Sequence, residues 1–114
     1  MANNLDFNRY RPPVLPVTLR DKKGTKLSVS LPSVELLDEF RANSDRLAQL
    51  VQHESEEMVD ALYDLAAKLL SNNRNLKKIT PDQLRTVYGM EEEDLVVLFY
   101  EYTAFINGVE NAKN

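Results

Sequence analysis

The chain has 114 residues, of which 43% are hydrophobic and 8% aromatic, and its formal net charge is -4. This length allows one domain with one core, and the apolar content is well above that of a disordered chain. The absence of Cys excludes a disulfide framework and any thiolate metal site, and it fits a reducing compartment. Because the sequence contains neither a signal-peptide core near Met1 nor an apolar run of about 18 residues, we expect a protein of the cytoplasm.

The charge is distributed unevenly along the chain. Residues 1–31 contain six Lys or Arg and two Asp, whereas residues 32–114 contain eight Lys or Arg and sixteen Asp or Glu, so the net charges are +4 and -8. Opposite potentials on one molecule can attract further copies of it, or can attract a basic partner to the acidic part. The alternative, that both charged regions are simply solvated, stays open.

The first part of the chain is predicted to form an arm and then a β-hairpin. Residues 1–13 show no period, and Pro12-Pro13 cannot extend a helix, so a flexible N-terminal arm is expected. Over residues 14–31 apolar and polar residues alternate, as in two strands with one apolar face. Asp21-Lys22-Lys23-Gly24 supplies the turn, with Asp to bond its own backbone and Gly to take a positive φ. The edges of an isolated hairpin are unpaired and invite another chain.

Four helices are predicted after the hairpin, because the apolar period changes from two to 3.6 at Pro32. Either Ser33 caps the first helix or Pro32 occupies its first position. The clearest start signal is the capping box Thr80-Pro81-Asp82-Gln83. The predicted helices cover residues 33–51, 55–71, 81–88 and 91–107. The fold class is therefore α+β, mainly α, with one domain over residues 14–108 and a flexible tail over residues 109–114.

No catalytic, cofactor or metal site is predicted. His53 is the one His of the chain, and the zinc-protease motif would need a second His at position 57, which is Glu. His53 and Ser55 are too close in sequence to face each other, and nothing supplies an oxyanion site. The consecutive acids Glu91 to Asp94 suit the positive end of a helix better than a calcium loop. We therefore expect a protein that is not an enzyme and needs no divalent metal.

Two of the predicted helices are apolar on more than one face. Val97, Tyr100 and Ala104 lie opposite the main apolar stripe of the last helix, and Val59 and Tyr63 widen the apolar arc of the second helix. Such a helix is either central in its own core or shared with a partner, and the sequence leaves both open. We take these five residues as candidate partner-binding residues. Self-association through the hairpin edges and the Val97 face is a further hypothesis.

Several segments occur together in an order that is typical of one known family. They are the Pro-Ser helix entry LPSVELLDEF, the Ser-Asn-Asn-Arg-Asn break after the second helix, the Thr-capped short helix and the aromatic final helix YEYTAFING. Between Val14 and Gly108 their spacing resembles the small tail assembly chaperones of long-tailed bacteriophages and prophages. The resemblance carries no individual functional residue.

The family resemblance implies a partner and a role. It implies a non-structural factor in the cytoplasm of the bacterial host that binds the tape measure protein and keeps its long apolar helices from aggregating. Such a factor also helps the tail tube protein polymerise and leaves before the tail is finished. It further implies that some ribosomes slip backward by one nucleotide near the end of the gene. Ala112-Lys113-Asn114 permits a slippery codon run, although an ordinary polar tail explains these residues equally well.

Two other functions remain open. One is a phage structural adaptor or connector subunit that stays in the particle, and the sequence does not separate it from a chaperone. The other is a small nucleic-acid-binding regulator, for which Arg9-Tyr10-Arg11 and Lys22-Lys23 would supply phosphate contacts and stacking. The helices that would enter a groove belong to the part with a net charge of -8, so electrostatic repulsion argues against the regulator.

Overall fold

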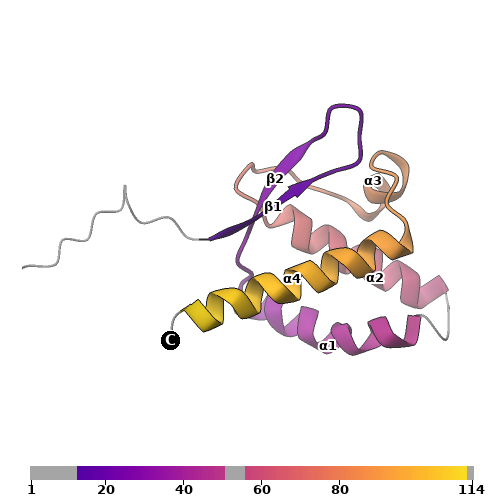
Figure 1. The fold of residues 1–114 in the computed structure, drawn as a ribbon. Coiled ribbons are helices and arrows are strands. Elements are labelled where there is room, and N and C mark those ends of the chain that lie inside the picture. The colour runs from indigo at the N-terminus through magenta and orange to yellow at the C-terminus, as the bar shows by residue number, and fades with distance from the viewer. Residues whose placement is uncertain (1–12, 51–55, 113–114) are drawn as a thin grey trace, which may run out of the picture.

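The computed structural model describes residues 13–50 and 56–112, and it has a hairpin followed by four helices (Figure 1). This confirms the predicted α+β, mainly α class. The expected arm over residues 1–13 lies almost wholly outside the described residues. In chain order the elements are β1 (Val14–Thr18), β2 (Lys26–Ser30), α1 (Val34–Leu50), α2 (Glu56–Ser71), α3 (Pro81–Thr86) and α4 (Glu92–Ala112).

The helix ends differ from the prediction in two places. Helix α3 ends at Thr86, and α4 continues past Asn107 and Gly108 to Ala112, so the predicted end at residue 107 was wrong. Gly destabilises a helix interior by only about 1 kcal/mol relative to Ala, so one Gly by itself does not end a helix. At the start of α1 the Ser33 hydroxyl accepts the Leu36 N–H at 3.2 Å, which settles the alternative in favour of a Ser33 cap.

The two strands pair in the predicted way. They are antiparallel, with Leu15 opposite Val29 and Val17 opposite Leu27. In the turn, the Asp21 carboxylate accepts the Thr25 N–H at 2.7 Å and the Thr25 hydroxyl at 2.6 Å, and Gly24 has a φ of 61°. The predicted roles of Asp21 and Gly24 are therefore confirmed.

The outer edge of β2 is covered, contrary to the expectation that both hairpin edges are unpaired. The Ser30 N–H donates to the Asn72 carbonyl at 2.8 Å, and the Arg74 N–H donates to the Ser28 carbonyl at 2.9 Å. This segment thus forms a bridge between Val29 and Asn73. The Asn-rich segment after α2 therefore pairs with the outer edge of β2 like a very short third strand. The sequence pattern did not indicate this pairing, because apolar and polar residues do not alternate in the segment.

The outer edge of β1 carries a proline. The backbone N–H and C=O groups of Ser28 and Ser30 point away from β1. Pro16 lies opposite Ser28. In an antiparallel pair, when the backbone groups of one residue point outward, those of the residue opposite point outward too, so the backbone of Pro16 faces the outer edge of β1. Because Pro has no N–H, it interrupts the donors on that edge and disfavours the addition of another strand. Any partner at this edge must therefore be held mainly by side chains.

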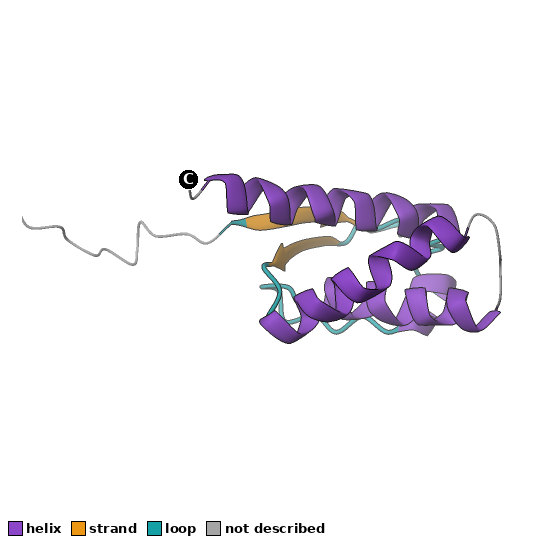
Figure 2. Ribbon diagram, turned by 90° about the horizontal axis from the view of Figure 1, so that it is seen from below, coloured by secondary structure: helices purple, strands orange, loops and turns teal. Residues whose placement is uncertain are grey.

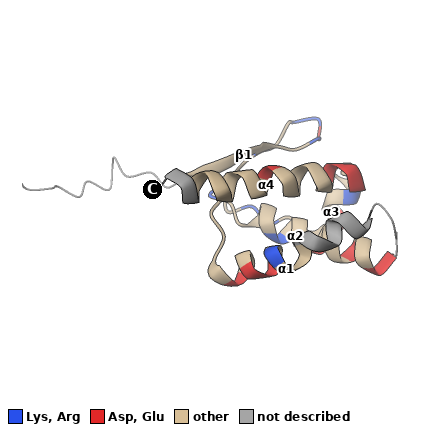
Figure 3. Ribbon diagram, turned by 60° about the horizontal axis from the view of Figure 1, so that its bottom comes forward, with Lys and Arg blue, Asp and Glu red and all other residues tan. Residues whose placement is uncertain are grey.

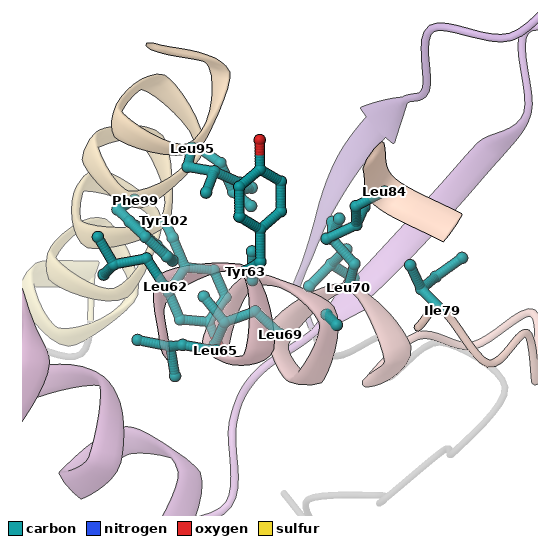
Figure 4. Packing of buried hydrophobic residues seen from close by; sticks show 14 of the residues in the cluster. Leu62, Tyr63, Leu65, Leu69, Leu70, Ile79, Leu84, Leu95, Phe99 and Tyr102 are labelled. Carbon is teal, nitrogen blue, oxygen red and sulfur yellow. The ribbon is translucent and has the colours of Figure 1, made fainter. Parts of the chain in front are cut away.

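Helix α2 is the centre of the core. It contacts α1, α3, α4 and β2, and Figure 4 shows its leucines between the side chains of α4 on one side and those around α3 on the other. Phe40 of α1 closes the core with an edge-to-face contact to Tyr102, with the ring centroids 5.0 Å apart. The fully buried members of the core include Leu62, Ala66, Leu69, Leu70, Leu84, Leu95, Phe99 and Tyr102.

Candidate protein-binding surface

Arg20, just after β1, ties the hairpin to the start of α4. Its guanidinium donates to both carboxylate oxygens of Asp94, at 2.9 and 2.8 Å, and to the Gly89 carbonyl at 3.0 Å. This fork-like geometry fixes orientation better than a single ion pair does. Hydrogen bonds from Arg20 and from the Glu91 N–H hold the pKa of Asp94 below its ordinary value. The clamp joins the end of β1 to the start of α4, and Figures 1 and 2 both show β1 beside α4.

A groove of about 340 Å³ runs between β1 and α4. The apolar side chains of Leu15, Val17, Val97 and Leu98 line it, and Asp94 and Glu101 lie on its α4 side. Side chains alternate between the two faces of a strand, so Leu15, Val17 and Leu19 point to the same face of the sheet and form the β1 side of the groove. Val97 could be identified from the sequence as a candidate binding residue, but Leu15 and Val17 could not, because nothing local in the sequence indicates that α4 lies beside β1.

The three candidate residues on α4, Val97, Tyr100 and Ala104, form an exposed apolar stripe. Val97 is 60% and Tyr100 73% exposed, and Ala104 is also exposed. The spacing of three and four residues places them on one face of the helix. Val97 belongs both to this stripe and to the groove, so the two form one continuous surface.

The charged residues of α4 itself are all negative. Helix α4 contains no Lys or Arg, and exposed Glu93 and Glu101 flank the stripe. Within the part of the chain that the structure describes, neither of these two carboxylates has an ion-pair partner. Asp94 differs, because Arg20 neutralises it. The uncompensated acids favour a partner with basic groups next to an apolar face.

The structure does not place Val59 and Tyr63 with the α4 stripe. Tyr63 is only 5% exposed, and its hydroxyl donates to the Met90 carbonyl at 2.7 Å, while the Arg85 guanidinium lies over its ring at 4.2 Å from the centroid. Val59 is half-buried and packs against the core. Helix α3 and the chain leading to Met90 cover this face of α2, so its second apolar side belongs to the core of the monomer.

The acidic run at the start of α4 has a structural role. The Asp94 carboxylate accepts the Glu91 N–H at 2.8 Å, and Glu92 and Glu93 lie in the first turn, where the helix dipole favours negative charge. Among the described residues no group of three or more His, Asp or Glu is arranged to hold a metal ion. His53 and Ser55, considered above as catalytic candidates, lie outside the described residues.

Several exposed apolar residues of the described part of the chain were not identified from the sequence, and Leu76 is the most exposed of them. Leu76, in the loop between α2 and α3, is 95% exposed and has a φ of 57°. A single Leu among polar residues gives no periodic signal, so no pattern in the sequence could indicate it.

None of the described helices is both long enough and apolar enough to cross a membrane. Comparison with known proteins finds no matching family model, no similar curated protein and no similar solved structure.

Proposed function

We propose that this protein is a non-catalytic binding protein that acts as a tail assembly chaperone of a long-tailed phage, with the tape measure protein as its client. The observation that carries this proposal is the exposed stripe of Val97, Tyr100 and Ala104, which continues into the groove beside β1. The order of elements along the chain, which resembles this family, supports the choice of client.

The stripe suits a helical client. An amphipathic helix can lie along α4 with its apolar residues in contact with Val97 and Tyr100, while the small Ala104 allows the two backbones to approach. Tyr100 is the expected anchor, because a large aromatic side chain gives much contact area for little lost conformational entropy. A tape measure protein offers long stretches of such helix, and covering their apolar side would keep them from aggregating.

The test is co-expression with the tape measure product, followed by capture of the complex. We expect Tyr100→Glu to reduce capture by about tenfold or more, because it places a charge in the centre of the contact. Val87→Glu, directly after α3, is the matched control, since Val87 is also apolar and 55% exposed but lies outside α4. Equal capture by the wild type and Tyr100→Glu would contradict the proposed surface.

A second measurement separates a chaperone from a structural adaptor or connector subunit. A chaperone is absent from purified, finished tails, whereas an adaptor is present in a fixed ratio to the other tail proteins. Mass spectrometry of such tails distinguishes the two, and its result does not depend on any variant.

A further inference from the structure

The loop between α2 and α3 presents Leu76 to solvent in an unusual way. Leu76 is 95% exposed and adopts the left-handed conformation, with a φ of 57°. An L-residue with a large side chain rarely takes this conformation, because its Cβ crowds the backbone. The fold thus accepts local strain at a side chain that makes little contact within the monomer.

The loop that carries Leu76 is well bonded. The buried Asn73 side chain donates to the carbonyls of Leu70 and Lys77, both at 2.7 Å, and accepts the Lys77 N–H at 3.1 Å. The Asn75 side chain accepts the Ser28 N–H at 2.8 Å. Because these bonds hold the loop on both sides of Leu76, the leucine is a fixed protrusion rather than the tip of a loosely held segment.

The surroundings of Leu76 are basic. Lys77 and Lys78 follow it in the chain and are exposed. Hydrogen bonds from Thr25 hold the pKa of Asp21 below its ordinary value, and the charge of Lys77 adds to this effect, so Lys77 lies near the hairpin turn. That turn contains Lys22 and Lys23, and Figure 3 shows basic residues in blue at the turn. Leu76 is therefore an apolar protrusion on the basic side of the molecule.

The groove has the complementary character. It is lined mainly by apolar side chains, and Glu101 is its uncompensated charge. Its volume of about 340 Å³ is ample for a leucine side chain. The groove lies beside β1, whereas the loop of Leu76 pairs with the outer edge of β2, so the two surfaces are at opposite edges of the sheet. Leu76 therefore does not occupy the groove of its own chain.

We propose that Leu76 of one copy docks into the groove between β1 and α4 of a second copy, so that Lys77 and Lys78 approach Glu101. Such a contact joins two different surfaces and leaves one of each free, so it builds rings or open chains rather than a closed symmetric dimer. A symmetric pairing of two α4 helices is less favourable, because it would bring Glu93 and Glu101 of both copies together with no basic residue on either helix. This inference goes beyond the proposed function and does not depend on the identity of the client.

The test uses two variants that each disable one of the two surfaces. Leu76→Glu removes the protrusion, and Val97→Lys places a positive charge in the groove. We expect the mass of the wild type in sedimentation experiments to rise with protein concentration, and each variant alone to remain a monomer. An equimolar mixture of the two should form a dimer, because one variant retains the groove and the other retains Leu76. Val87→Lys is the matched control and should associate like the wild type.

Three results would overturn the proposal. The first is a wild type that stays monomeric at every concentration, and the second is a mixture that stays monomeric while the wild type associates, which would indicate a symmetric interface. The third is a Leu76→Asn variant that associates as the wild type does. Asn tolerates the left-handed conformation, so this variant should keep or raise the melting temperature while losing association. An unchanged or higher melting temperature together with lost association would show that Leu76 acts in the contact between copies and not in folding.

Discussion

At the scale of single residues, a few polar atoms determine how the elements are held together. The fork between Arg20 and Asp94 joins residues that are 74 positions apart in the sequence. The Asn73 side chain fixes the loop after α2 with three hydrogen bonds. Tyr102 is the exception, because its hydroxyl is buried and has no hydrogen-bond partner among the described residues. Burial raises the pKa of Tyr102 to about 12, since the charged form would lack solvation.

Replacing Tyr102 by Phe should therefore leave the free energy of unfolding unchanged or raise it by about 1 kcal/mol. The ring contact with Phe40 is retained, while a buried hydroxyl without a partner is removed. Urea denaturation followed by circular dichroism measures the change. A loss of more than about 1 kcal/mol would mean that the hydroxyl has a partner in the folded protein.

The Arg20–Asp94 clamp should make the free energy of unfolding depend on pH in the acidic range. The pKa of Asp94 is lowered in the folded state, so its contribution is fully present above the unfolded pKa of about 3.9 and is lost as the pH falls through the folded pKa. Asp94→Asn should thus flatten the decrease in unfolding free energy between about pH 5 and pH 2. Arg20→Gln should flatten it in part, because the Glu91 N–H still bonds the carboxylate. A decrease as steep as that of the wild type in Asp94→Asn would contradict this account.

At the scale of elements, local chemistry determines where most helices start. The Thr80 hydroxyl accepts the Gln83 N–H at 3.1 Å, and the Gln83 side chain accepts the Thr80 N–H at 3.0 Å, which completes the predicted capping box. Pro81 follows at a position where a missing N–H costs nothing. These bonds matter because α3 is short and places the fully buried Leu84 against α2.

Removing the cap should destabilise the protein without changing its surface. Thr80→Ala should lower the free energy of unfolding by about 1 kcal/mol, because the first turn of α3 loses an acceptor. Thr86→Ala is a suitable control, since the Thr86 hydroxyl only donates to the Asp82 carbonyl within the same helix. Chemical denaturation of both variants measures the difference, and equal effects would show that the cap contributes nothing specific.

At the scale of the whole molecule, the small core and the proposed binding surface share the same helix. Helix α4 buries Leu95, Phe99 and Tyr102 on one side and exposes Val97 and Tyr100 on the other. The charges add a second asymmetry, because Lys77 and Lys78 follow Leu76 in the chain, whereas basic residues at the hairpin turn and acids along α4 are visible in Figure 3. The molecule is therefore suited to contacts at two different places.

This division predicts that stability and binding can be changed separately. Tyr100→Glu should change the free energy of unfolding by less than about 0.5 kcal/mol, because the side chain is mostly exposed. Phe99→Ala, its neighbour in the chain, should lower it by about 3 to 5 kcal/mol, because it opens a cavity beside Phe40. Thermal or urea denaturation tests both variants. A large loss in Tyr100→Glu would mean that the stripe is part of the core.

The sequence by itself determined the elements and their local starts, because these depend on neighbouring residues. The sequence alone predicted the change of period at Pro32, the turn at Asp21 to Gly24 and the cap at Thr80. It left open whether the second apolar face of α4 is buried or exposed. The tertiary structure alone decided which apolar faces are covered. Tyr63 is buried because α3 lies over it, Asn73 pairs with β2, and β1 meets α4 because Arg20 reaches Asp94. These contacts join distant parts of the chain, and local patterns do not encode which distant surfaces will meet.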